Sequence, residues 1–292
     1  MNKQGLSITV IVAVRNEARN IGRCLSALKL AQRVVVVDSH STDATSAIAH
    51  ACGADVVQFE YRGGYPKKRQ WALENLDIAT EWVLLVDADE VVTDALWKEI
   101  ALEITQPRSC DAYIVTKEFH FLGRQFRYGG FSHSAVLLFR KGRAVFEELY
   151  DTVQIQLDME VHERLIVSGL IGRLHAPLIH EDFKGLTAYI ERHNQYSSWE
   201  AGVRYAYLSS GRYGNTTIQP KLFGNVQERR RYLKGIAIRM PFEPLLWFIY
   251  HYLFRLGFLE GRRGLIACQI RASYIMQVRA KLYELKSGNR MH

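Results

Sequence analysis

Three acidic side chains at the end of an apolar run could do chemistry in this 292-residue chain. The run Trp-Val-Leu-Leu-Val leads directly into Asp87-Ala88-Asp89-Glu90. Carboxylates one residue apart at a strand end can hold Mg²⁺ or Mn²⁺, because these hard cations prefer oxygen ligands and keep positions for phosphate oxygens. A solvated loop is the alternative interpretation of such a pair. A second acid, Asp38, ends another apolar run, which favours the metal site.

The elements that must position these acids follow from the first 105 residues, where β-branched runs alternate with segments of helical spacing. This alternation predicts an α/β fold with a mostly parallel, doubly wound sheet and helices on both faces. Ligands bind such sheets beyond the carboxyl ends of the strands, where Asp38 and Asp87 are expected. The expected strands are 7–14, 33–37, 55–59 and 82–86, and the expected helices are 20–30, 44–52, 67–76 and 94–104.

The pattern changes after residue 110. Short strands are expected at 111–119, 135–140, 163–167 and 171–179. A long helix over 183–209 follows, with Asp182 as its expected N-cap. A Gly- and Asn-containing stretch at 210–224 is typical of a linker, and helices are expected at 226–240 and 262–286.

These motifs resemble the family 2 glycosyltransferases, inverting enzymes of the GT-A fold that use nucleotide-sugar donors. The resemblance covers nearly the whole chain. A His-Glu motif and a late Leu-Gly-Phe-Leu-Glu-Gly-Arg stretch are similar to the members that build lipopolysaccharide inner core and related surface glycans. The matching segments are Val14-Arg15-Asn16-Glu17, Asp38-Ser-His-Ser41-Thr42-Asp43, Lys68-Arg69-Gln70, Asp87-Ala88-Asp89-Glu90, Val161-His162-Glu163 and Leu178-Ile179-His180.

The resemblance implies a role for each matching residue. Asp38 would read the nucleobase, since a carboxylate can accept the uracil N3–H, and Arg69 would face the phosphates, which suit a guanidinium. Asp89 and His180 would hold Mg²⁺ or Mn²⁺. The implied nucleotide-sugar-binding residues are Val14, Asn16, Glu17, Asp38, Ser41, Lys68, Arg69, Asp87 and Ala88.

The resemblance places the catalytic carboxylate at Glu163, with His162 beside it. The family usually carries Glu-Asp at this place, so His162, Asp158 and Glu160 stay open as alternative proton acceptors. A positioned carboxylate in line with the anomeric carbon would activate the acceptor hydroxyl. A single displacement would then invert the anomeric centre.

The positive charge lies at one end of the chain. Residues 220–292 contain 14 Lys and Arg against 4 Asp and Glu, a net of +10, within a chain of net charge +8. Residues 245–258 form an aromatic block that is too short to span a bilayer. An apolar block with basic flanks suits an anionic inner-membrane surface, and packing on the catalytic domain is the alternative. Nucleic acid is not expected as a partner, because the aromatic residues do not alternate with the basic ones.

We therefore expect a GT-A domain at 1–209 and a helical, basic, membrane-associating region at 210–292. Residues 1–105 would bind the nucleotide-sugar and 106–209 the acceptor. The expected activity is transfer from a UDP-sugar to a lipid-linked or lipid-embedded glycan acceptor in lipopolysaccharide core or other cell-surface polysaccharide synthesis.

The four scattered cysteines indicate a reducing compartment, so the expected location is cytoplasmic, at the inner face of the inner membrane. Two other functions remain open from the sequence. One is a non-catalytic basic adaptor on a degenerate transferase fold, which would bind membrane or nucleic acid. The other is a sugar-phosphate nucleotidyltransferase, although the loop at Arg15 lacks the glycines of that class.

Overall fold

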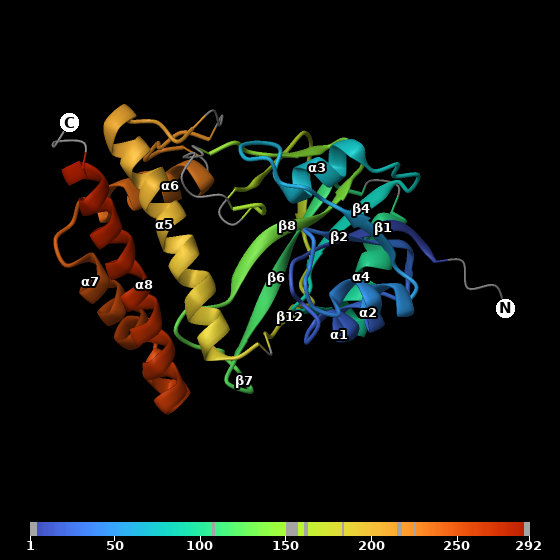
Figure 1. Cartoon of the computed structure of the whole chain (residues 1–292), viewed down its shortest axis with the longest axis horizontal. Coiled ribbons are helices and arrows are strands. Elements are labelled where there is room, and N and C mark those ends of the chain that lie inside the picture. The colour runs from blue at the N-terminus through green and yellow to red at the C-terminus, as the bar shows by residue number, and fades with distance from the viewer. Residues whose placement is uncertain are drawn as a thin grey trace. The chain divides into compact units, whose positions relative to one another are not determined.

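The chain divides into two compact units (Figure 1). The computed structural model describes residues 5–106, 109–149, 157–160, 163–182, 184–214, 218–224 and 226–288. The first unit, which holds the main sheet, comprises Met1–Phe126, Phe131–Phe146 and Asp158–Gly185. The second unit, which holds the long C-terminal helices, comprises Arg127–Gly130, Glu147–Leu157 and Leu186–His292.

Four parallel strands form one half of the main sheet, in the order β3-β2-β1-β4. They confirm the four strands predicted for this half. Their runs are rich in Val and Ile, and the last seven residues of β1 are buried, as suits a strand covered on both faces. The strands are β1 (Leu6–Val14), β2 (Ala31–Asp38), β3 (Asp55–Gln58) and β4 (Trp82–Asp87).

Helices cover both faces of this half, with α3 on one side and α1, α2 and α4 on the other (Figure 1). Thr93 caps α4 by accepting a hydrogen bond from the Leu96 amide at 3.1 Å. The first helix is shorter than predicted, because the chain turns after Ser26 to reach β2. The helices are α1 (Ile21–Ser26), α2 (Thr45–Ala51), α3 (Lys68–Asn75) and α4 (Asp94–Ile104).

The other half of the sheet is mixed. It continues from β4 in the order β8-β6-β12-β5, and β8 runs antiparallel to both β4 and β6. The segment predicted as one strand over 171–179 forms two, because Pro177 lacks the amide that a sheet needs. The strands are β5 (Glu90–Val92), β6 (Ala112–Phe121), β8 (His133–Arg140), β11 (Ile171–Arg173) and β12 (Leu178–His180), with the short β7 (Arg124–Gln125), β9 (Ala144–Phe146) and β10 (Leu165–Val167).

The pairing of β5 with β12 positions the acidic cluster. These two strands are antiparallel, and His180 lies opposite Glu90. Because β5 begins directly after Asp87-Ala88-Asp89, this register brings a histidine from residue 180 to the end of β4. A three-residue strand carries too little pattern to be recognised in the sequence.

The second unit contains long helices that pack on each other. Helix α5 (Leu186–Ser210) packs against α8 (Gly261–Gly288) around Ala201, Tyr274 and Val278. Helix α6 (Val226–Ala237) and α7 (Glu243–Ile249) lie between them in sequence, and a π-helical turn (Tyr250–Phe254) and a 3₁₀ turn (Gly257–Glu260) follow α7. None of the helices in the described ranges is both long and apolar enough to cross a membrane.

The prediction that Asp182 caps the long helix is wrong. The helix begins at Leu186, four residues later. The Asp182 carboxylate instead accepts hydrogen bonds from the Lys184 amide at 2.9 Å and from the Asn20 side chain at 3.0 Å. This acid therefore fastens the segment after β12 to Asn20, just before α1.

Candidate active site

The two acidic strand ends flank the end of β1. In the sheet, Asp38 pairs with Val14 on one side of β1, and Asp87 pairs with Ala13 on the other. The connection from β1 therefore leaves the sheet between two carboxylates. The strand order β3-β2-β1-β4 reverses direction between β1 and β4, and open α/β sheets bind ligands at such a switch point.

Asp38 is a fixed, buried carboxylate. It accepts hydrogen bonds from the Ser41 amide (3.1 Å) and hydroxyl (2.5 Å), the Ser46 hydroxyl (2.6 Å) and the Gln58 amide (3.3 Å). Burial alone would raise the pKa of Asp38, but these hydrogen bonds outweigh it and lower the pKa. A carboxylate has about four acceptor positions, so these four donors fill them, and the 3.3 Å bond from Gln58 is the longest.

The loop after β1 is joined to the loop after β2. The Asn16 amide donates to Ser41 Oγ at 2.8 Å, and Asn16 Oδ1 accepts from the Thr42 amide at 2.8 Å. Asn16 has a φ of 55°, a conformation that Asn tolerates better than most residues. The structure thus brings together Asn16, Ser41 and Asp38, three of the residues that the sequence singled out.

Lys68 lies under the end of β1. Its ammonium donates to the Val14 carbonyl at 2.8 Å and pairs with Asp158 at 2.9 Å. Burial lowers the pKa of Lys68, and the nearby Asp158 opposes that effect only in part. This pair connects the start of α3 to the segment that carries the candidate bases.

Asp158, Glu160 and Glu163 each bond to residues at or just before the start of α3. The Glu160 carboxylate accepts from the Arg69 and Gln70 amides at 3.1 and 2.9 Å, which caps the helix. Glu163 Oε1 is 2.6 Å from the Lys67 ammonium and accepts the Tyr65 hydroxyl at 2.9 Å, and the side chains of Glu163 and Lys67 are both fully buried. Burial raises the pKa of Glu163, but Lys67 outweighs this and lowers it. His162 lies outside the described residues.

Asp87 is held between two cations. It contacts the Arg69 guanidinium, and its second oxygen is 3.0 Å from the Lys117 ammonium. Lys117 also pairs with Glu90 at 2.5 Å, and Glu90 accepts the Asp87 amide at 2.8 Å. Burial would raise the pKa of Asp87, but Arg69 and Lys117 hold it far below its ordinary range. Asp87 therefore carries a charge that the protein itself neutralises.

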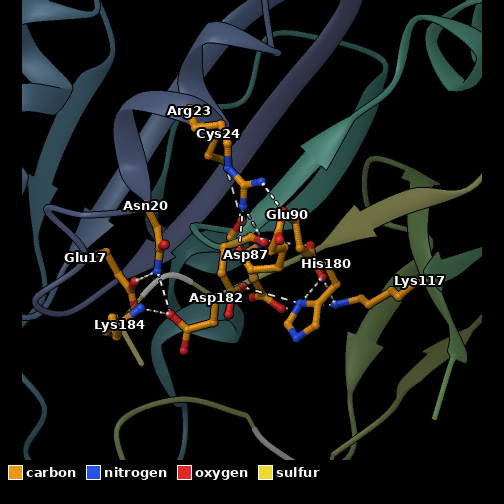
Figure 2. A network of polar contacts seen from close by, with 12 residues as sticks. Glu17, Asn20, Arg23, Cys24, Asp87, Glu90, Lys117, His180, Asp182 and Lys184 are labelled. Atoms are coloured by element: carbon orange, nitrogen blue, oxygen red, sulfur yellow. Dashed lines mark hydrogen bonds and ion pairs between the residues drawn. The ribbon is translucent and has the colours of Figure 1, made fainter. Parts of the chain in front are cut away.

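His180 faces two carboxylates. Its Nδ1 is 3.5 Å from Asp89 Oδ1. The same atom is 3.6 Å from Glu90 Oε1 (Figure 2). Burial lowers the pKa of His180, but Asp89 and Glu90 outweigh this and raise it to about 9. The buried Nδ1 makes no hydrogen bond to the part of the chain that the structure describes.

This donor set fits a divalent cation that takes its other ligands from a substrate. Asp89 offers a carboxylate oxygen, and His180 Nδ1, 3.5 Å away, would become a ligand when a metal displaces its proton. Within the described ranges, no group of three or more His, Cys, Asp or Glu side chains could hold a metal. Two protein ligands leave most coordination positions to water and phosphate oxygens, as is usual for Mg²⁺ in nucleotide sites.

A second set of contacts fixes the strand that carries His180. Arg23 donates to the Glu181 carbonyl at 2.5 Å and pairs with the Glu181 carboxylate at 3.2 Å. Asn20 donates to Glu17 at 2.9 Å, and Lys184 pairs with Glu17 at 2.5 Å (Figure 2). Burial raises the pKa of Glu17 despite the nearby Lys184. These contacts tie the loop after β1 to the segment after β12.

Sequence reasoning missed Lys117, Arg23 and Lys184. The sequence pattern could have identified Lys117. On β6 it follows Tyr113 and Val115 at a spacing of two, so it shares their buried face. A lysine in phase with core residues needs a buried acidic partner. Arg23 and Lys184 had no such signal, because their partners lie more than 150 residues away along the chain.

The family model of glycosyl transferase family 2 matches residues 9–154, half of the chain. The chain belongs to this family. This glycosyltransferase therefore has the GT-A fold, a mixed α/β architecture, as the resemblance implied. The match includes the acids at the ends of β2 and β4, and it favours a glycosyltransferase over a nucleotidyltransferase or a non-catalytic adaptor.

Relatives extend the likeness over the rest of the glycosyltransferase. The lipopolysaccharide core biosynthesis glycosyltransferase LpsC of Rhizobium meliloti is 24% identical over 286 residues, covering 96% of this chain and 93% of the relative. The uncharacterized glycosyltransferase RT0209 of Rickettsia typhi is 24% identical and covers 97% of this chain and 89% of its own. Among solved structures, the mannosyltransferase PcManGT from Pyrobaculum calidifontis, in complex with GDP-Man and Mn²⁺, has a TM-score of 0.48 at 15% identity, covering 96% and 87% of the two chains.

The Asp38 environment predicts a pH-dependent contribution to stability. Asp38→Asn should lower the free energy of unfolding by about 1–3 kcal/mol at neutral pH, because an amide nitrogen then faces hydrogen-bond donors. The folded pKa lies below the ordinary value of 3.8, so the ionised group stabilises the fold above that value and less as pH falls through the lowered pKa. The difference between the variant and wild type should be constant down to about pH 4 and shrink below it.

Urea denaturation over this pH range measures the difference. Asp55→Asn is the control, because that side chain lies at the amino end of β3 and is 56% exposed. A difference between wild type and Asp38→Asn that grows on acidification would contradict the assigned environment.

Proposed function

We propose that this glycosyltransferase moves a sugar from a UDP-sugar to a glycan acceptor with inversion, with Mg²⁺ or Mn²⁺ bound at Asp89 and His180. The observation that carries the proposal is the arrangement of Asp38 and Asp87-Ala88-Asp89 on either side of the end of β1. The nucleobase would lie on the β2 side and the diphosphate on the β4 side. Val14, Asn16, Glu17, Ser41, Lys68, Arg69 and Ala88 would line the donor site.

The leaving group sets the electrostatic requirement. Cleavage of the anomeric bond leaves negative charge on the diphosphate, which the site must stabilise. The bound metal would supply Lewis-acid stabilisation of those oxygens. Arg69 and Lys117 offset the charge of Asp87, so Asp87 adds little repulsion toward an incoming diphosphate. Asp89, which lies 3.5 Å from His180, is the proposed metal ligand.

Glu163 is the proposed base, and its present hydrogen-bond partners limit how it could take a proton. A base needs its proton acceptor within hydrogen-bond reach of the acceptor hydroxyl. Glu163 Oε1 is held by Lys67 and Tyr65, so acceptor binding would have to replace or share these bonds. Asp158, paired with Lys68 and with an 18% exposed side chain, is the competing carboxylate.

The acceptor class comes from the full-length likeness to LpsC. Because that relative is named a lipopolysaccharide core glycosyltransferase, we infer a surface-glycan acceptor that is lipid-linked or lipid-embedded. Such an acceptor would place the enzyme at the cytoplasmic face of the inner membrane. The net charge of +10 over residues 220–292 supports an anionic surface as its partner.

A donor screen tests the proposed activity. UDP release would be measured for a panel of UDP-sugars with Mn²⁺ or Mg²⁺, with and without lipopolysaccharide-type acceptors, and a GDP-sugar panel would serve as comparison. Release from one UDP-sugar that rises with acceptor supports the proposal. Release only from GDP-sugars, or none from any donor with an acceptor present, would refute it.

Asp89 should be required for metal-dependent binding. Asp89→Ala should abolish turnover and remove the increase in UDP affinity that Mn²⁺ gives. Because Asp89 is buried beside His180, the melting temperature of the variant is measured as well, to show that the fold survives. UDP titrations with and without Mn²⁺ measure the affinity. Asp55→Ala, at the opposite edge of the sheet, should behave as wild type. Wild-type metal dependence in Asp89→Ala would end the assignment.

Glu163→Gln should lower transfer by ~10²-fold or more, with donor affinity near wild type. The same change leaves the Lys67 ammonium buried without its charge partner, which costs about 3–5 kcal/mol. The double variant Glu163→Gln with Lys67→Met removes that cost and separates stability from catalysis.

Rates at saturating donor, together with melting temperatures, decide between the two carboxylates. If Glu163 is the base, the double variant is stable and still inactive, and Asp158→Asn keeps most of its activity. A stable, active double variant together with an inactive Asp158→Asn would transfer the role to Asp158.

A further inference from the structure

An exposed apolar ridge runs along α7 and the π-helical turn of the second unit. It consists of Phe242, Leu245, Leu246, Tyr250, Leu253 and Phe254, whose exposed fractions are between 43% and 73%. From Leu245 to Phe254, steps of three and four residues place them on one face of the helical segment, and Phe242 precedes that segment as its N-cap. Phe258 and Leu259, also exposed, follow at the next turn.

The opposite face of the segment is packed and polar. Glu243 pairs with Arg204 at 2.9 Å and with Arg279 at 3.3 Å. Trp247 packs on the core shared by α5 and α8, and His251 Nδ1 is 2.6 Å from the Gly129 carbonyl. The inner face therefore anchors the segment, so the exposed ridge is a fixed surface of the unit.

Along the segment, the acidic side chains are buried and the basic side chains are exposed. Residues 239–263 contain two acids, and both are turned inward: Glu243 pairs with arginines, and the buried Glu260 accepts the amides of Arg127 and Tyr128 at 2.7 and 2.8 Å. The exposed charged residues of this range, all of which the structure describes, are Arg239, Arg255, Arg262 and Arg263. The ridge is thus flanked by positive charge alone.

Both ends of the segment hold bulky residues in the left-handed conformation. Phe242 has a φ of 59° and Leu256 a φ of 60°, where glycine or asparagine is the usual occupant. Their side chains are 73% and 42% exposed, so burial inside this unit does not repay the strain. Strained residues kept at such positions point to a role outside the fold's own packing.

We propose that the ridge is the surface by which this glycosyltransferase lies on an anionic lipid bilayer. The apolar side chains would enter the boundary between headgroups and acyl chains, and the four arginines would meet the lipid phosphates. A second copy of the chain fits less well, because a two-fold interface would bring the same arginines together. This proposal rests on the proposed function, because a lipid-borne acceptor gives the enzyme its reason to bind a membrane. The ridge would be the membrane-facing part of the second unit.

Vesicle sedimentation of the full-length protein tests the proposal. Wild type should bind phosphatidylcholine vesicles that contain about one third phosphatidylglycerol, bind pure phosphatidylcholine weakly, and lose part of its binding when salt shortens the Debye length to about 3 Å. Leu253→Ser with Phe254→Ser should lower the partition coefficient by about a hundredfold, since each buried side chain contributes about tenfold. Arg262→Glu with Arg263→Glu should remove the preference for anionic lipid.

Matched controls lie in the first unit. Leu102→Ser removes an apolar side chain that is 66% exposed on α4, and Arg62→Glu reverses a charge whose side chain is 84% exposed. Both should bind vesicles as wild type does. Wild type that ignores anionic vesicles at low salt, or a ridge variant that binds as well as the controls, would overturn the proposal, as would a ridge variant that only converts a dimer to a monomer.

UDP binding separates this proposal from the proposed function. The Leu253→Ser, Phe254→Ser variant and the Arg262→Glu, Arg263→Glu variant should both bind UDP with wild-type affinity. None of these four positions is a donor-site residue. If wild type binds vesicles through the ridge but binds no nucleotide, the proposed activity fails and the membrane surface stands. If wild type binds UDP but no vesicle, the membrane surface fails and the proposed donor binding stands.

Discussion

The ion pairs of Asp87 with Arg69 and Lys117 are the interaction on which the rest of the site depends. Several carboxylates lie near the ends of β2 and β4, and their mutual repulsion would otherwise oppose this fold. Arg69 brings the start of α3, which Glu160 caps, and Lys117 connects Asp87 to Glu90. Glu90 begins β5, whose pairing with β12 delivers His180. The same pairing brings His180 within 3.5 Å of Asp89, its proposed partner at the metal.

The parallel half of the fold was predictable because each strand is a short β-branched run with a helix after it. The acids at its strand ends were predictable for the same reason, since parallel strands end at one edge. The mixed half was not: β5 and β12 each have three residues, and their pairing depends on contacts between residues 90 and 180. That pairing is nonetheless what places His180 beside Asp89.

The sequence motif does not distinguish which of the candidate acids is the base. The sequence places Glu163, Asp158 and Glu160 within six residues, and nothing in that spacing distinguishes a base from an anchor. The structure gives each acid a partner at the start of α3, through Lys67, Lys68 and the Arg69 amide. The aromatic block of the C-terminal region is similar: its apolar residues were visible in the sequence, but the inward turn of Glu243 and Glu260 depends on partners from distant segments.

The most direct test of the central claim is a crystal structure of the enzyme with UDP and Mn²⁺. The account predicts uracil within hydrogen-bond distance of the Asp38 carboxylate, the diphosphate at the end of β4, and the metal between Asp89 and His180, with Asp87 still paired to Arg69 and Lys117. A metal bound by Asp87 in place of Asp89, or UDP bound away from the ends of β1 and β2, would contradict it.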